Sequence, residues 1–161
     1  MNRQEAKEVC LVSLEKSNFT VIELPTGFGK TALAISLINH LVETKYQGKH
    51  TSMLLLVAKT VHKQTWKDEF KKWGGINVDE LTIECYESLK KHEYESFDFV
   101  VMDECHHLHS NKRLDLFSTL TYGHVIGLSA TIPKKLKQYF QYEYAAEVVT
   151  CSIVDAIEDE V

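Results

Sequence analysis

One stretch of the sequence, residues 24–31 (Leu-Pro-Thr-Gly-Phe-Gly-Lys-Thr), constrains the fold more than any other. A short β-rich run at 19–23 precedes it, and an apolar run of helical type at 32–38 follows it. Glycines in the stretch let the backbone bend and approach a ligand closely. Backbone N–H groups of such a loop and of the following helix N-terminus point at phosphate oxygens. The pattern therefore predicts a strand, a phosphate-binding loop and a helix.

The side chains of this stretch fit the same chemistry. Lys30 would reach the β- and γ-phosphates of a nucleotide, and the Thr31 hydroxyl would ligate Mg²⁺. The general pattern G-x-x-x-x-G-K-[ST] asks for glycine at the position where this chain has Leu24. A plain Gly-containing turn followed by Lys-Thr is the alternative interpretation, so a second signal is needed.

Apolar runs alternate with amphipathic segments along the rest of the chain. The runs 52–58 and 97–102 are almost continuously apolar, as in parallel strands buried on both faces. Further strands are expected at 81–86 and 125–128, with helices at 3–16, 61–73, 87–91, 113–120 and 133–140, and a polar loop at 45–51. This alternation predicts an α/β fold with a mostly parallel central sheet.

Two of the expected helices have a readable apolar face. In the first helix the apolar positions are Ala6, Val9, Cys10, Val12 and Leu14, which lie on roughly one side. In the helix at 61–73 the spacing predicts that Trp66, Phe70 and Trp73 share one face, opposite the lysines.

Composition narrows the class of protein. The chain has 161 residues, 44% of them hydrophobic and 25% charged, which fits one domain with a real core. No apolar run approaches the ~20 residues of a membrane helix, and the four cysteines form no C-x-x-C pair, so a cytoplasmic protein with reduced thiols is expected. The formal net charge of −5 means that any nucleic-acid site must be a local patch or shared with other parts of a longer protein.

The second signal is acidic and follows the apolar run 97–102. Ligands of open α/β sheets bind beyond the carboxyl ends of the strands, where Asp103 and Glu104 are expected. Asp103 would hold Mg²⁺, and Glu104 would orient and deprotonate the water that attacks the γ-phosphate. A solvated strand end is the alternative for this pair taken alone. The nearby histidines 106, 107 and 109 could form a metal cluster, but they are close in sequence and have no distant partner.

Three strings occur in a fixed order: Pro-Thr-Gly-Phe-Gly-Lys-Thr at 25–31, Asp-Glu-Cys-His at 103–106 and Ser-Ala-Thr at 129–131. In this the chain resembles the superfamily 2 helicases and translocases of the DExH type, whose motifs I, II and III they match. The resemblance implies a RecA-like P-loop NTPase domain with helices on both faces of the sheet. It assigns nucleotide binding to Thr26, Gly27, Phe28, Gly29, Lys30 and Thr31, catalysis to Lys30, Asp103, Glu104 and His106, and coupling of hydrolysis to movement to Ser129, Ala130 and Thr131.

Weaker matches flank these three motifs. Gln4, after Arg3, resembles the upstream glutamine that reads adenine, which implies ATP. The segment 56–60 resembles motif Ia, which touches the nucleic-acid backbone, and it places Lys59 and Thr60 as the candidate contacts. The family usually has proline where this chain has Ala58. The resemblance favours DNA over RNA as the nucleic acid.

The resemblance covers one half of a two-domain motor. We expect residues 1–150 to form the first RecA-like domain, and residues 151–161 to begin a linker toward a second RecA-like domain of a longer protein. We expect this fragment to be a monomer without a membrane partner. We also expect it to hydrolyse ATP barely or not at all. Two alternatives stay open: a non-catalytic nucleotide-dependent binding or switch module, and a small-molecule kinase, for which the chain has few arginines.

Overall fold

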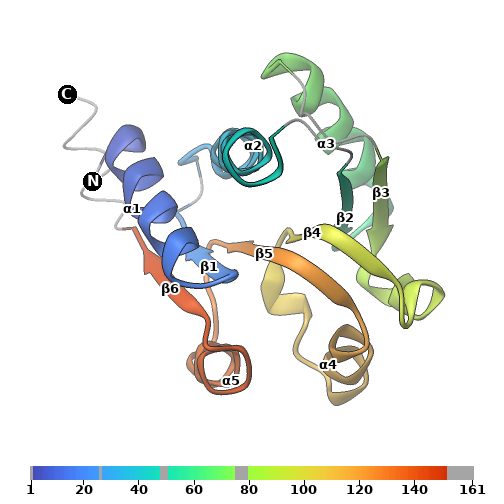
Figure 1. Ribbon diagram of the computed structural model, residues 1–161. Helices are drawn as coiled ribbons and strands as arrows, with labels where there is room; N and C mark the ends of the chain where they lie inside the picture. Colours follow the sequence, from blue (N-terminus) through green and yellow to red (C-terminus); the bar gives the residue numbers. More distant parts are fainter. Residues whose placement is uncertain (1, 26, 48–50, 75–79, 152–161) are drawn as a thin grey trace.

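Strands alternate with helices along residues 2–25, 27–47, 51–74 and 80–151, the part of the chain that the computed structural model describes (Figure 1). In chain order the elements are α1 (Arg3–Lys16), β1 (Phe19–Glu23), α2 (Lys30–Leu41), the π-helical turn η1 (Val42–Tyr46), β2 (Ser52–Val57), α3 (Thr60–Lys72), β3 (Glu80–Cys85), the 3₁₀ turn η2 (Tyr86–His92), β4 (Ser96–Met102), the 3₁₀ turn η3 (Cys105–His107), α4 (Asn111–Ser118), β5 (Thr121–Ser129), α5 (Lys134–Tyr144) and β6 (Glu147–Thr150).

The strands form one sheet in the order β3-β2-β4-β5-β1-β6, and every neighbouring pair is parallel. Helices α1, α2 and α3 cover one face of this sheet, and α4 and α5 cover the other (Figure 1). The predicted α/β fold with a parallel sheet between two helical layers is confirmed.

The core has one apolar cluster on each face of the sheet. Because successive strand side chains point to opposite faces, strand β2 supplies both clusters. Its residues Met53, Leu55 and Val57 belong to the cluster under α1–α3, and Leu54 and Leu56 belong to the cluster under α4 and α5. This two-sided burial explains why the run 52–58 is apolar throughout.

The parallel sheet brings the strand ends that precede the predicted site residues to one edge. Glu23, the last residue of β1, is paired in register with Ser129, the last residue of β5. On the neighbouring strands Met102 is paired with Gly127 and with Leu56, so β4 ends beside β5 and β2. The segments that leave β1, β2, β4 and β5 therefore meet on this edge, as expected for an open α/β sheet.

Two predictions of buried faces were partly wrong. Val9 and Val12 of α1 are 39% and 53% exposed, because the helix buries Ala6, Cys10 and Leu14 instead, at the i, i+4, i+8 spacing of a single stripe. Trp73 is 49% exposed, although Trp66 and Phe70 are buried as predicted. The reason is that α3 ends at Lys72, and Trp73 is its C-cap with non-helical backbone angles.

The element boundaries differ from prediction in several places. Helix α5 runs on to Tyr144, and α4 spans Asn111–Ser118. Strand β6 was not predicted, and it extends the sheet by pairing with β1 at the edge. Strand β5 begins at Thr121, four residues before the predicted start, because its first residues pair with β4 across the less buried end of the sheet. The π-helical turn η1 includes Lys45 and Tyr46, which were predicted to be in a loop, and its C-cap Gln47 has a left-handed φ of 50°.

A histidine clamp joins the edge strand β3 to the start of β4. The His92 ring contacts Glu95 at 3.0 Å through Nδ1 and Glu84 at 3.2 Å through Nε2. Burial lowers the pKa of His92, but the two carboxylates raise it by more, so the net shift is upward. Burial raises the pKa of Glu84, but hydrogen bonding to His92 and the charge of Lys63 lower it to below its ordinary value.

We predict a pH-dependent loss of stability in a His92→Gln variant. The contacts that raise the His92 pKa stabilise the fold fully at pH below 6.5, the ordinary histidine pKa. This stabilisation is lost as the pH rises through the pKa of His92 in the folded protein. The lowered Glu84 pKa adds stability above its ordinary value of 4.5. Urea unfolding of wild type and variant should therefore differ most between these two values and less at alkaline pH. A difference in unfolding free energy that is equal in this interval and at alkaline pH would contradict the stabilising role of the clamp. The matched control is His40→Gln on α2, whose difference from wild type should not follow this pH pattern.

Candidate nucleotide-binding site

The loop between β1 and α2 turns sharply at its glycines. Gly27 and Gly29 both have φ of +86°, in the left-handed region that L side chains rarely adopt. The loop is tied to the sheet because the Leu24 N–H donates to the Ser129 carbonyl at 2.9 Å. Helix α2 begins at Lys30, and its first turn closes when the Leu33 N–H donates to the Gly29 carbonyl at 3.0 Å. Thr26, predicted to contact the nucleotide, lies outside the described residues.

A small cavity opens at this loop, with a volume of about 130 Å³. Its walls come from the loop, from the segment after β4 and from the segment after β5: Leu24, Pro25, Gly27, Phe28, Gly29, Lys30, Glu104 and Ala130. The cavity thus lies at the N-terminus of α2, where unpaired backbone N–H groups and the helix dipole favour an anion. Thr31, the next residue of α2, follows Lys30 in the first helical turn.

Lys30 connects the loop to the acidic strand end. Its ammonium lies 3.1 Å from Asp103 Oδ1 and also forms an ion pair with Glu104. Burial lowers the pKa of Lys30, but the charges and hydrogen bonds of Asp103 and Glu104 raise it by more, so the net shift is upward. The side chain therefore stays a cation at the mouth of the phosphate-sized cavity. The sequence separately indicated these three residues, and the structure brings them together.

Asp103 is held from several sides. Its N–H donates to the Leu56 carbonyl at 2.9 Å, and its carbonyl accepts from the Tyr86 hydroxyl at 2.7 Å. The indole N–H of Trp66 donates to Oδ2 at 2.8 Å. Oδ1 is buried and, among the described residues, has no hydrogen-bond partner beside its ion pair with Lys30. A carboxylate oxygen left in this way suits a hard cation such as Mg²⁺, which prefers oxygen ligands.

A chain of contacts joins the acidic pair to the end of β5. Glu104 Oε2 lies 3.6 Å from His106 Nδ1, and this nitrogen lies 2.8 Å from the Ser129 hydroxyl oxygen. The Ser129 hydroxyl donates to the Thr131 carbonyl at 2.9 Å, so it can accept a hydrogen bond from His106. Glu104 itself has a left-handed φ of 48°, which turns the chain sharply after β4. The predicted link between His106 and Ser129 is present as a contact.

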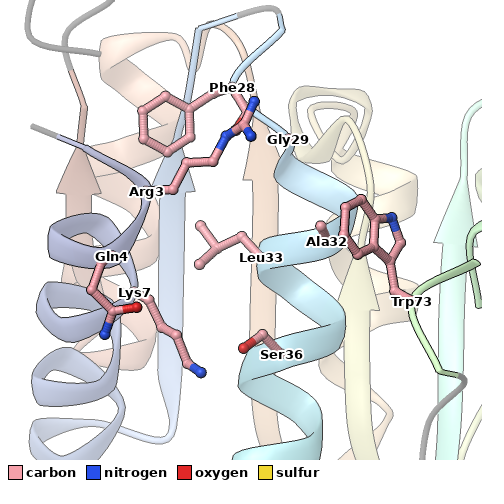
Figure 2. Close-up of a pocket in the computed structure, with 9 residues that line it drawn as sticks. All are labelled: Arg3, Gln4, Lys7, Phe28, Gly29, Ala32, Leu33, Ser36 and Trp73. Atoms are coloured by element: carbon pink, nitrogen blue, oxygen red, sulfur yellow. The ribbon is translucent and has the colours of Figure 1, made fainter. Parts of the chain in front are cut away.

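A larger cavity of about 350 Å³ lies beside the loop, across α2 from α1 to Trp73 (Figure 2). Its lining residues are Arg3, Gln4, Lys7, Phe28, Gly29, Ala32, Leu33, Ser36 and Trp73. The Arg3 Nε–H donates to the Phe28 carbonyl at 3.1 Å, so α1 is pinned to the phosphate loop. Gln4, which was predicted to read adenine, lines this cavity together with residues of the phosphate loop.

The tentative nucleic-acid residues lie apart from these cavities. Lys59 is the N-cap of α3, and Thr60 is its first residue, both after the carboxyl end of β2. The Thr60 hydroxyl is 3.8 Å from the Cys85 thiol at the end of β3. Their place at the strand-end edge agrees with the motif Ia interpretation, and their contact with nucleic acid stays a prediction.

The three neighbouring histidines contact one another as well as other residues. His106 contacts Ser129, and its ring lies against the His107 ring with centroids 4.6 Å apart. His107 also stacks on the Tyr86 ring at 5.9 Å, and His109 Nδ1 lies 3.1 Å from the His106 carbonyl oxygen. Among the residues that the structure describes, these histidines belong to no group of three or more side chains placed to hold a metal ion. Sequence reasoning missed the Trp66 and Arg3 contacts, because both depend on residues distant in sequence.

The parallel sheet, the glycine loop at the end of β1 and the acidic end of β4 have the arrangement expected for the RecA-like domain of a superfamily 2 helicase. The chain belongs to the family of the type III restriction enzyme res subunit, whose model matches residues 2–134. The match contains the phosphate loop and the ends of β4 and β5.

Curated relatives carry helicase and restriction-enzyme names. A protein of African swine fever virus, named "Putative ATP-dependent RNA helicase QP509L", is 29% identical over 131 residues, which cover 68% of this chain and 24% of the relative. The "Probable helicase D10" of Escherichia phage T5 is 25% identical over 157 residues, covering 85% of this chain and 33% of the relative. The chain thus spans about a quarter to a third of the length of these two relatives.

Solved structures show the same fold. A nuclease-deletion mutant of the type ISP restriction-modification enzyme LlaGI, in complex with a DNA substrate mimic, superposes with a TM-score of 0.67 at 16% identity, over 98% of this chain and 20% of that one. The Sulfolobus solfataricus SWI2/SNF2 ATPase core in complex with double-stranded DNA gives a TM-score of 0.67 at 13% identity, over 96% of this chain and 45% of that one.

Within the described ranges, no helix is both long enough and apolar enough to span a bilayer.

Proposed function

We propose that the chain is the ATP-binding first motor domain of an ATP-dependent nucleic-acid helicase or translocase, with DNA favoured over RNA. The observation that carries the proposal is the meeting of Lys30, Asp103 and Glu104 at the mouth of the phosphate loop. A cation, a buried carboxylate with one oxygen paired, among the described residues, to that cation alone and a second carboxylate beside the phosphate-sized cavity are groups that nucleotide hydrolysis requires. Family membership and the shared fold support the same class of protein.

In this proposal the triphosphate lies on residues 24–31, and the base lies in the larger cavity near Gln4 and Phe28. Thr31 and Asp103 would hold Mg²⁺, which when bound neutralises charge on the phosphate oxygens. Lys30 would turn from the carboxylates to the β- and γ-phosphates. Glu104 lines the phosphate-sized cavity, so it could accept a proton from a water that attacks the γ-phosphate.

Coupling to a second domain would use the end of β5. His106 and Ser129 are in contact, and Ala130 lines the phosphate-sized cavity. A change around Glu104 could thus pass to residues 129–131 at the sheet edge. We propose that residues 151–161 begin the connection to that second domain; residues 152–161 of this segment lie outside the described residues. The second domain would supply the arginine that stabilises the transition state, a group worth about 10³–10⁵ in rate.

The test is ATP hydrolysis by two proteins: this chain alone, and the longer polypeptide in which we propose it lies. Each is assayed without nucleic acid and with single-stranded and duplex DNA and RNA. The account predicts ATP binding but almost no turnover by the chain alone, and nucleic-acid-stimulated turnover by the longer protein. Strong stimulated turnover by the chain alone would refute the split-motor account. ATP binding without turnover in either protein would favour the switch module.

A further inference from the structure

Trp66 makes a polar contact that its position in the core does not require. The side chain is 2% exposed and packs against Phe70, with ring centroids 5.6 Å apart. A buried indole N–H needs an acceptor, and a backbone carbonyl would satisfy it. Here the acceptor is Oδ2 of Asp103, a carboxylate that is itself only 7% exposed. A hydrogen bond to a carboxylate is shorter and stronger than a hydrogen bond between two neutral groups.

This contact decides which oxygen of Asp103 faces the nucleotide site. Rotation of a carboxylate about its last side-chain bond is soft and roughly two-fold, so the backbone does not fix the orientation of the oxygens. The Trp66 N–H takes Oδ2, which leaves Oδ1 toward Lys30 at 3.1 Å. Lys30 cannot fix the orientation of the carboxylate alone, because its side chain is long, flexible and partly exposed, and because its ammonium also pairs with Glu104.

We propose that Trp66 is a positioning residue that orients Asp103 for Mg²⁺, so that the metal meets Oδ1 without reorganisation of the carboxylate. The inference rests on the proposed nucleotide-binding function and adds a residue to it from α3. Partners that hydrogen-bond a metal ligand from behind fix its direction, and their loss typically weakens metal binding by about 10–100-fold. Tyr86 differs, because its hydroxyl holds the Asp103 carbonyl and not the carboxylate.

The first experiment is a Mg²⁺ titration of binding of a fluorescent ATP analogue to the 161-residue chain, followed by anisotropy. Trp66→Phe keeps an aromatic ring in the core and removes the N–H. We expect its Mg²⁺ midpoint to rise about 10–100-fold, while affinity for the analogue without Mg²⁺ stays at the wild-type value. Phe70→Leu disturbs the packing of α3 but not the hydrogen bond, so its midpoint should match wild type.

The outcomes distinguish a failure of the role proposed for Trp66 from a failure of the proposed nucleotide-binding function. An unchanged midpoint in Trp66→Phe, or an equal rise in Phe70→Leu, would overturn the role of Trp66 and leave the proposed function standing. Failure of wild type to bind the analogue at any Mg²⁺ concentration would instead overturn the proposed function. Circular dichroism of each variant confirms that the comparison is made between folded proteins.

A second measurement does not depend on how well Trp66→Phe folds. The chain has two tryptophans, so the Trp66 indole N–H resonance in a ¹H–¹⁵N spectrum can be assigned as the one that remains in Trp73→Phe. Mg²⁺ on Oδ1 would withdraw charge from Oδ2 and weaken the hydrogen bond from Trp66. We expect this resonance to move when Mg²⁺ is added to the nucleotide-saturated protein; a resonance that stays in place would contradict the proposal.

Discussion

A Glu104→Gln variant of the proposed two-domain enzyme is expected to bind ATP as wild type does and to lose hydrolysis by about 10²–10⁴-fold. Glutamine keeps the size of the side chain that lines the phosphate-sized cavity, but it cannot accept a proton from water. Asp103 keeps its ion pair with Lys30, so the cation at the loop keeps a partner. Single-turnover hydrolysis, measured together with ATP affinity, separates the chemical step from binding.

The control for this variant is Glu143→Gln, which changes an exposed carboxylate on α5. We expect both its ATP affinity and its rate to equal those of wild type. If Glu104→Gln hydrolysed ATP at the wild-type rate, another group would have to activate water. The assignment of Glu104 from its place after β4 would then be wrong.

A Lys30→Ala variant is expected to lose nucleotide affinity by about 10–100-fold, the equivalent of a charged hydrogen bond of ~1.5–3 kcal/mol. Lys30 is the cation that lines the phosphate-sized cavity, and it offsets two carboxylates there. Without it, Asp103 and Glu104 would face the triphosphate with like charge. The affinity is measured with the fluorescent ATP analogue in the presence of Mg²⁺.

The same substitution should also lower stability, because it leaves the buried Asp103 carboxylate without its ion-pair partner. We expect a loss of about 1–3 kcal/mol in the free energy of unfolding, measured with urea. Lys45→Ala removes a surface lysine that pairs with Glu15 at 3.0 Å, and it should cost less than about 1 kcal/mol with no change in nucleotide affinity. Wild-type affinity in Lys30→Ala would rule out the loop as the phosphate site.

Much of the fold was predictable because the strong signals are local. The run 52–58 is apolar at every position that faces either core cluster, so its period and length identified β2 without a partner. Glycine at 27 and 29 marks left-handed backbone that other residues rarely adopt. Once the sheet was expected to be parallel, the ends of β1, β4 and β5 had to share an edge, and Lys30 could be expected near Asp103.

The parts that escaped prediction depend on contacts between distant residues. Strand β6 is four residues long, with a mixed burial pattern, and it is defined by pairing with β1 more than 120 positions earlier. Val9 and Val12 are hydrophobic enough for the core, but α1 buries a single narrow stripe of residues, and these two side chains lie outside it. The Trp66 hydrogen bond joins residues 37 apart, and no spacing rule could have paired them.

The central claim is that ATP binds where residues 24–31 meet the end of β4. The most direct test maps backbone amide shifts in the ¹H–¹⁵N spectrum of the chain as Mg²⁺-ATP is added. The account predicts saturable shifts that are largest at residues 27–31 and at Asp103 and Glu104, with a second group around Gln4 in the adjoining cavity. Shifts that do not saturate, or that gather on another part of the surface while these amides stay in place, would contradict it.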